Sequence, residues 1–131
     1  MALTYDTPKL VTANNSWSSV VTAANTNRDG TGTIVDIVTA AAAGTVIEKI
    51  VVQATATTTA GMVRLYVHNG TDYRLFREYT IAAVTASASV ACTRVTETFD
   101  VPLVIPTGYK IAASTHNAEA FTVWALGGEL T

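Results

Sequence analysis

Charged side chains, cysteine and proline are all scarce in this sequence of 131 residues. Charged residues make up 14% of it, whereas they make up about 25% of a typical soluble domain. The single cysteine, Cys92, excludes an internal disulfide, and its position in an alternating apolar run indicates a small buried side chain rather than a nucleophile. A domain of this length can bury about two thirds of its unfolded surface, so it needs neither a disulfide nor a metal to hold a core.

The sequence also lacks a basic run, a membrane segment and a leader-like N-terminus. The net charge is −2, and no cluster of Lys and Arg provides an electrostatic footprint for nucleic acid. The charge-free stretch at 79–93 is too short and too polar to span a bilayer. Residues 1–11 lack the basic and apolar regions of a signal peptide. We therefore expect a protein that binds neither nucleic acid nor membrane and that folds in the cytoplasm without export.

Alanine and threonine take the place of the missing charges. A soluble monomer usually covers itself with Lys, Glu, Asp and Arg, whereas this chain would expose threonine hydroxyls and alanine methyls. Because interface cores are depleted in charge, such a surface is typical of a subunit buried against other subunits. An exposed, threonine-rich β surface is the alternative, and the composition leaves both open.

Short runs rich in β-branched residues, separated by turn residues, dominate the chain. We predict strands at residues 31–40, 45–57, 61–70, 72–83, 87–100, 102–106, 108–115 and 120–128. Eight short strands at this spacing predict an all-β fold, an antiparallel β-sandwich or a barrel. A helix is a poor fit, because glycine and threonine around the alanines at 40–43 leave no room for one.

The N-terminal part differs from the rest of the chain. Residues 27–131 are predicted to form the sandwich domain, and residues 1–26 an N-terminal arm or a possible extra strand. The first fifteen residues have no core pattern and either cross onto a neighbouring subunit or are merely frayed. The segment 16–26 could add a strand, with Trp17 and Val21 on one face at a period of two residues.

The stretch "RLYVHNGTDYRLFRE" at 64–78 is predicted to be a hairpin, because Asn-Gly is a strong turn signal between alternating runs. Leu75 and Phe76 are adjacent, so either they face opposite sides or a bulge turns both inward. The polar face of the hairpin could contact another subunit or the shell of a larger assembly. That prediction covers Arg64, Tyr66, His68, Tyr73, Arg74 and Arg77. The alternative is that these side chains are ordinary cross-strand partners.

Motifs that carry metal or phosphate chemistry are missing. Two histidines far apart and one cysteine do not provide a zinc site. "NRDGTGT" at 27–33 has one carboxylate, so a tight turn with Gly30 and Gly32 is favoured over a cation site. The same glycines open a strand rather than a helix, which excludes a phosphate-binding loop. We predict no metal and no cofactor.

Two arrangements could suggest hydrolysis, and neither fits well. Ser114, His116 and Glu119 are close in sequence, but triad members normally come from distant segments and no nucleophile elbow is present. The segment 114–121 is better explained as a turn between strands. Glu97, Asp100 and Glu119 could meet in space as paired carboxylates, although Glu97 and Asp100 lie near a strand end. We predict no catalytic residue and no enzymatic activity.

Three segments of the sequence resemble a known group of proteins: "NRDGTGTIVDIVTA", "ATTTAGMVRLYVHNGTDYRLFRE" and "VPLVIPTGYKIAASTHNAEAFTVWALGGEL". Over residues 27–131 the chain resembles small proteins encoded in the structural gene clusters of tailed bacteriophages. The resemblance implies a jelly roll or related β-sandwich in the virion. It further implies a capsid decoration (cement) protein, a homotrimer on the outer surface of the shell whose partner is the major capsid protein. None of the three segments is a catalytic motif.

Two other functions stay open at this stage. A tail, fibre or spike component could bind a cell-surface glycan through outward aromatics such as Tyr66, Tyr73 or Tyr109. A hydrolase could use Glu97, Asp100 or His116. Trp17 and Trp124 lie in patterned apolar runs and are therefore expected in the core or in an interface.

Overall fold

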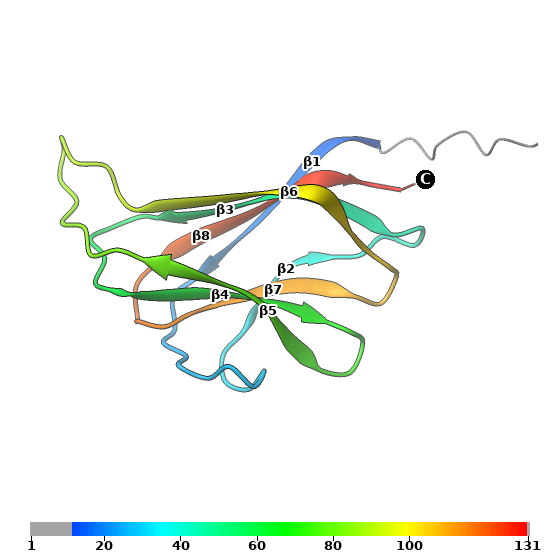
Figure 1. The fold of residues 1–131 in the computed structure, drawn as a ribbon, viewed down its shortest axis with the longest axis horizontal. Helices are drawn as coiled ribbons and strands as arrows, with labels where there is room; N and C mark the ends of the chain where they lie inside the picture. The colour runs from blue at the N-terminus through cyan, green and yellow to red at the C-terminus, as the bar shows by residue number, and fades with distance from the viewer. Residues whose placement is uncertain (1–11, 131) are drawn as a thin grey trace, which may run out of the picture.

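The computed structural model describes residues 12–130, with side chains described from residue 16 onward. Over that range the chain forms no helix, and two four-stranded antiparallel sheets pack face to face as a β-sandwich (Figure 1). The strands are β1 (Thr12–Val21), β2 (Val35–Thr39), β3 (Thr45–Ala54), β4 (Gly61–His68), β5 (Tyr73–Ile81), β6 (Arg94–Ile105), β7 (Lys110–Thr115) and β8 (Phe121–Glu129). The all-β sandwich of eight strands predicted from the sequence is confirmed. No helix in the described part of the chain is long and apolar enough to cross a membrane.

The strands pair in a nested order. β1 pairs with β8, β2 with β7, β3 with β6 and β4 with β5, each pair antiparallel. Pairing of β3 with β8 and of β4 with β7 joins them into a first sheet, β1-β8-β3-β6, and a second sheet, β2-β7-β4-β5. A long hairpin of strand pairs rolled into two sheets is the jelly roll.

Alternating apolar side chains from both sheets fill the space between them. In β8 the inward residues are Phe121, Val123 and Ala125, and in β4 they include Val63 and Leu65. Full burial of each valine, leucine or phenylalanine stabilises the fold by roughly 1.5–3 kcal/mol. The period of two in the sequence therefore reports directly which residues form the core.

The two strands predicted at 87–100 and 102–106 are one strand in the structure, β6. Residues 82–93 instead connect β5 to β6 and protrude from one end of the sandwich (Figure 1). Pro102 does not end the strand, because it lies in the register shift between Thr98 and Leu103 of the edge strand β6, where a bulge tolerates a missing backbone N–H. The alternation of 87–93 runs into the strand without a turn residue, which is why the prediction placed the strand too early.

The β4–β5 hairpin forms as predicted, with a turn in which Gly70 has a φ of 93°. The pairing register shifts between Leu65 and Tyr66, which leaves Phe76 in a β-bulge. Phe76 packs against the core, whereas Leu75 is 37% exposed on the other side. The bulge therefore exists, but it turns only one of the two side chains inward.

The segment offered as an additional strand at 16–26 is found as β1, which begins at Thr12 and pairs with β8 of the same chain. Trp17 and Val21 face the core together, while Val20 faces out. The predicted crossing of an arm onto a neighbour concerns residues 1–15, of which 1–11 lie outside the described residues.

The close approach of β8 to β3 gives a first prediction. A Cβ atom added to Gly127 would lie 1.9 Å from the carbonyl oxygen of Val46, which is backbone and cannot swing away. Gly127→Ala should lower the free energy of unfolding by about 3 kcal/mol, measured by denaturant titration.

Gly108→Ala is the matched control for this substitution. Gly108 has a φ of 87° and no heavy atom within 4 Å of an added Cβ, so it tests backbone strain without a collision. Its cost should be near 1 kcal/mol, that is about the penalty for a left-handed alanine. Equal costs at the two positions would contradict the collision at Gly127.

Candidate functional site

The outer face of the second sheet is covered by residues 22–34, which we call the cover loop. Ala24 forms an isolated parallel bridge with Thr115 of β7, and the backbone N–H of Asn25 donates to the carbonyl of Thr115 at 2.8 Å. The loop thereby begins by running along β7, and it ends where β2 starts at Val35. This face of the sandwich is consequently closed by the chain itself.

Asn25 organises the cover loop. Its side-chain amide donates to the carbonyls of Thr31 and Thr33 at 2.9 and 3.0 Å, and its Oδ1 accepts from the backbone N–H of Asn27 at 3.0 Å. With only 5% of its surface exposed, Asn25 replaces by side-chain bonds the backbone pairing that the irregular loop lacks.

Gly30 and Gly32 are both required by the geometry of the loop. Each has a positive φ, 87° and 86°. An added Cβ would lie 2.3 Å from the carbonyl oxygen of Tyr73 at Gly30, and 2.7 Å from the amide of Asn25 at Gly32. The tight turn predicted for "NRDGTGT" is therefore present, and it serves to bring the loop onto the sheet.

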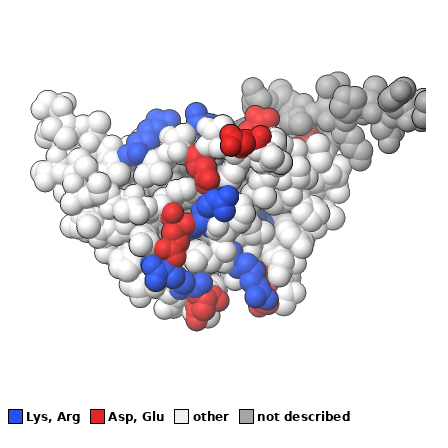
Figure 2. All heavy atoms as spheres, viewed as in Figure 1, with Lys and Arg blue, Asp and Glu red and all other residues white. Residues whose placement is uncertain are grey.

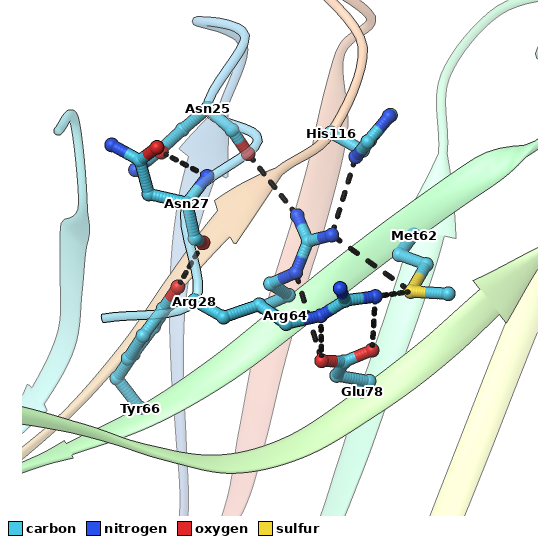
Figure 3. A network of polar contacts seen from close by, with 8 residues as sticks. All are labelled: Asn25, Asn27, Arg28, Met62, Arg64, Tyr66, Glu78 and His116. Carbon is cyan, nitrogen blue, oxygen red and sulfur yellow. Dashed lines mark hydrogen bonds and ion pairs between the residues drawn. The ribbon is translucent and has the colours of Figure 1, made fainter. Parts of the chain in front are cut away.

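Arg64 and Tyr66 lie beneath the cover loop (Figure 3). Their exposed fractions are 1% and 0%. The guanidinium of Arg64 donates to the carbonyl of Asn25 at 3.2 Å, and the hydroxyl of Tyr66 donates to the carbonyl of Asn27 at 2.8 Å. The sequence correctly placed both side chains on the outward side of β4, but the loop covers them, so they do not reach the surface of the subunit.

Further contacts neutralise the buried guanidinium. Glu78 lies 3.9 Å from Arg64 Nε and accepts from Arg28 Nε at 2.5 Å. The hydrogen bond from Arg28 lowers the pKa of Glu78 below its ordinary value, so this carboxylate stays charged between two arginines. Arg64 Nη2 also bonds His116 Nδ1 at 3.2 Å. Because a guanidinium only donates, His116 Nδ1 is the acceptor in this hydrogen bond.

The other four predicted contact residues are distributed over two places. His68 and Tyr73 stack edge to face with ring centroids 4.5 Å apart, and the Tyr73 hydroxyl donates to Asp36 Oδ1 at 2.7 Å. Burial, followed by this hydrogen bond, raises the pKa of Tyr73 to about 12. Arg74 is largely exposed beside Asp72, at 3.5 Å. Their role in contacting another subunit or a capsid stays a prediction.

Arg77 faces the edge between β5 and β6 and not the cover loop. Its Nε donates to Glu97 Oε2 at 3.2 Å, and the hydroxyl of Tyr79 donates to Glu97 Oε1 at 2.6 Å. Phe76 and Phe99 meet beside them, with ring centroids 6.2 Å apart. Glu97 of β6 thus ties the two sheets together where the sandwich would otherwise be open.

Figure 2 shows that acidic and basic side chains form a band across the molecule in this view. The far left end, where the connection 82–93 protrudes in Figure 1, shows no Lys, Arg, Asp or Glu. Val90 in this connection is 47% exposed. In this view, the end of the sandwich that carries the connection 82–93 therefore has no charged side chains.

The catalytic hypotheses are not supported by the geometry. Ser114 is fully buried next to Arg64 and its hydroxyl has no hydrogen-bond partner, while His116 is bonded to Arg64. Glu119 instead accepts from the backbone and hydroxyl of Thr59 at 2.9 and 2.6 Å. Ser114, His116 and Glu119 therefore do not form hydrogen bonds with one another, as a catalytic triad would require.

The paired carboxylates and the glycan platform each lose one member to a structural contact or to burial. Glu97 is bound to Arg77 and Tyr79. Tyr66, one of three tyrosines considered for stacking on a sugar, is buried and cannot take part. Among residues 12–130 no group of three or more His, Cys, Asp or Glu side chains could hold a metal ion.

Sequence reasoning missed Asn25, Arg28, Glu78 and His116, which together hold Arg64. The only local signal for this cluster was the pair of glycines at 30 and 32, which marked a tight turn but not its target. The partners of Arg64 come from the cover loop, β5 and the segment after β7, so no spacing in the sequence could connect them.

Comparisons with known proteins give matches at the level of structure. No protein-family model matches the chain, and no curated protein matches it. One solved structure, described as a pentameric capsid protein isolated from metagenomic phage sequences, is 16% identical, with a TM-score of 0.45 over 99% of this chain and 73% of that chain. A second structure with the same description, solved by iodide phasing, is 15% identical, with a TM-score of 0.44 over 89% of this chain and 74% of that chain.

The role of Asn25 can be tested by truncation. Asn25→Ala removes three side-chain hydrogen bonds inside the cover loop and should lower the free energy of unfolding by about 2–3 kcal/mol. Asn27→Ala makes the same chemical change two residues away, where the side chain bonds only the exposed hydroxyl of Thr31, and should cost less than about 0.5 kcal/mol. Chemical denaturation measures both, and similar losses would contradict the assigned role of Asn25.

Tyr79 gives a prediction for alkaline pH. Burial, followed by the hydrogen bond to Glu97, raises the pKa of Tyr79 above its ordinary value. A raised pKa in the folded state contributes stability that is fully present below the unfolded pKa of about 10 and is lost as pH rises above it. Between about pH 9 and 11 the wild type should therefore lose more unfolding free energy than Tyr79→Phe.

Urea titrations at successive pH values measure this difference, which isolates Tyr79 from other groups that titrate at alkaline pH. Tyr73→Phe serves as a second arm and should remove a smaller part of the loss, because Tyr73 is less buried. Parallel stability curves for the wild type and Tyr79→Phe would show that the Tyr79 hydroxyl does not couple to folding.

Proposed function

We propose that this chain is a non-enzymatic structural protein of a phage virion, which decorates and stabilises the capsid shell as an oligomer. More specifically, we propose a homotrimer that lies on the outer surface of the shell and binds the major capsid protein. The resemblance of residues 27–131 to small proteins of phage structural gene clusters supports this role.

One observation carries the proposal: with the exception of Asp100, the titratable side chains singled out for chemistry hold one segment of the chain to another. Arg64 and His116 hold the cover loop, and Glu97 joins β6 to β5. Glu119 accepts a hydrogen bond from the backbone N–H of Thr59 and so joins the segment before β8 to the segment before β4. Because these polar groups make contacts within the chain, we look for the function in contacts that the surface makes with other proteins. That surface is poor in charge and carries exposed apolar side chains, as expected for a subunit that binds others.

The jelly roll is compatible with this role, because the same architecture builds viral capsid domains as well as lectins and cupins. Architecture by itself does not decide among these functions. The buried position of Tyr66 removes part of the platform on which the glycan-binding alternative depended. We therefore favour binding to protein over binding to sugar.

Capsid binding tests the proposal. Purified chain mixed with undecorated capsids of its own phage should co-sediment with them to saturation. Arg74→Glu, at the exposed hairpin end, should weaken binding by about tenfold, since a reversed charge at a contact costs affinity. Ser89→Glu adds an acidic side chain in the connection at the opposite end of the sandwich and should bind like the wild type.

Wild-type chain that stays in the supernatant at all capsid concentrations would overturn the decoration role. Saturable binding with equal affinities for wild type and Arg74→Glu would support the role while removing the hairpin from the contact.

A further inference from the structure

The charged side chains divide unevenly between the two sheets. On the second sheet, the cover loop and the β5–β6 edge, the charged groups form ion pairs or hydrogen bonds. Over residues 16–130, the charged side chains without such a partner are Glu48, Lys49, Arg94 and Asp100. All four belong to β3 and β6, the neighbouring strands of the first sheet.

A β-bulge directs two of these charges outward. Ile47 and Ile50 of β3 both lie in the core, although they are three positions apart and strict alternation would place them on opposite faces. Against β8, the register shift between Ile47 and Lys49 makes Glu48 the extra residue, so Glu48 and Lys49 both project from the outer face. Against β6 the extra residues are on β6 itself, between Thr98 and Leu103. On β6, Phe99 packs against the core, and the next residue, Asp100, is exposed.

Apolar side chains share this outer face. Three of the six large hydrophobic side chains that are exposed alternate with core residues along strands of the first sheet and therefore point outward: Val20, Val104 and Trp124. Trp124 lines a shallow groove of about 290 Å³ together with Val51, Gln53, Arg94 and Leu126. Among the residues that the structure describes, no segment like the cover loop lies over Trp124, which is 37% exposed. Apolar surface and unpaired charges of both signs therefore occur together on one face.

We infer that this outer face of the first sheet binds the same face of a second copy of the chain, around a two-fold axis that crosses the strands at Trp124. A surface that carries both unpaired cations and unpaired anions is complementary to itself when a two-fold axis exchanges them. An external partner of one sign would leave either the arginine and lysine or the two acids unmatched. The inference does not depend on the capsid role.

The strand register shows how the two copies would match. The row through Trp124 contains Val51 and Thr96, and equally distant rows on either side contain Arg94 and Thr98 of β6. Rotation about the axis places Arg94 of one copy over Thr98 of the other, next to the bulge that carries Glu48 and Asp100. Each Arg94 then lies near two acidic side chains of the second copy, Glu48 and Asp100, and near only one basic side chain, Lys49. Trp124 of one copy lies over Trp124 of the other. Two sheets packed face to face in this way have the spacing of a sandwich core, about 10 Å.

The symmetry of the inference separates it from the trimer in the proposed function. A two-fold contact alone gives a dimer, and combined with a trimer it gives a closed hexamer. Either way the number of subunits is even. Capsid binding, by contrast, is measured with shells, so one proposal can fail while the other stands.

Light scattering after size exclusion of the full chain, loaded at about 100 μM and then diluted, should give an even multiple of the chain mass. Trp124→Glu should dissociate the assembly along this contact. Leu75→Glu is the matched control, because Leu75 is also 37% exposed but lies on β5 of the second sheet. Both side chains face outward, and an unchanged unfolding curve verifies that each variant folds.

A charge exchange tests the orientation. Arg94→Glu should weaken association by about tenfold or more, because it faces Glu48 and Asp100 of the second copy. Adding Asp100→Arg to Arg94→Glu should restore most of the lost affinity, since the attraction is re-formed with reversed signs. Asp100→Arg alone should weaken association as Arg94→Glu does.

Several results would overturn the inference. A monomer or a trimer at every concentration excludes the two-fold contact. An even assembly that survives Trp124→Glu, or that Leu75→Glu dissociates equally, places the interface elsewhere. Failure of the double variant to recover affinity excludes the arrangement in which Arg94 meets the bulge of the second copy.

Discussion

A guanidinium group buried on the outer face of a sheet sets the conditions for much of this structure. Arg64 is 1% exposed, and a buried charge is strongly destabilising unless it is paired and hydrogen-bonded. Its compensation comes from the carbonyl of Asn25, the carboxylate of Glu78 and the imidazole of His116. The charge of Arg64 thereby makes a long irregular loop, a strand and a turn depend on one another.

The cover loop follows from the same condition. A loop that must approach Arg64 and Tyr66 closely needs backbone conformations that only glycine adopts without strain, which explains Gly30 and Gly32. It also needs a partner for its own unpaired backbone groups, and Asn25 provides one. One face of the sandwich is thus completed by the chain itself, whereas in the described part of the chain no such segment lies over Trp124 on the other face.

The sequence predicted the strands well because each strand has one face in the core. The alternation of Val63 and Leu65 or of Val123 and Ala125 needs no knowledge of the partner strand. It placed Arg64 and Tyr66 outward for the same reason and could not foresee that residues far before them would cover them. The bulges at Phe76 and Glu48 break the alternation locally, and the nested pairing that defines the jelly roll is a property of distant strands. Long-range contacts of this kind cannot be predicted from local patterns. The burial of Ser114 is one example, because it depends on the pairing of β7 with β4.

The edges of the sandwich explain why we place association on a face. An exposed edge strand can pair with another chain, and proteins blunt it with proline, bulges or shortness. β6 contains Pro102 and a register shift, β5 contains the bulge at Phe76, and β2 has five residues with a shift of its own. Three of the four edge strands are therefore poor templates for strand addition. β1 has a register shift only near its start, between Thr12 and Asn15, and pairs regularly with β8 from there on; its outward residue Val20 belongs to the apolar face around Trp124. With pairing along most edges hindered, burial of that face is the route that leaves the least apolar surface in water.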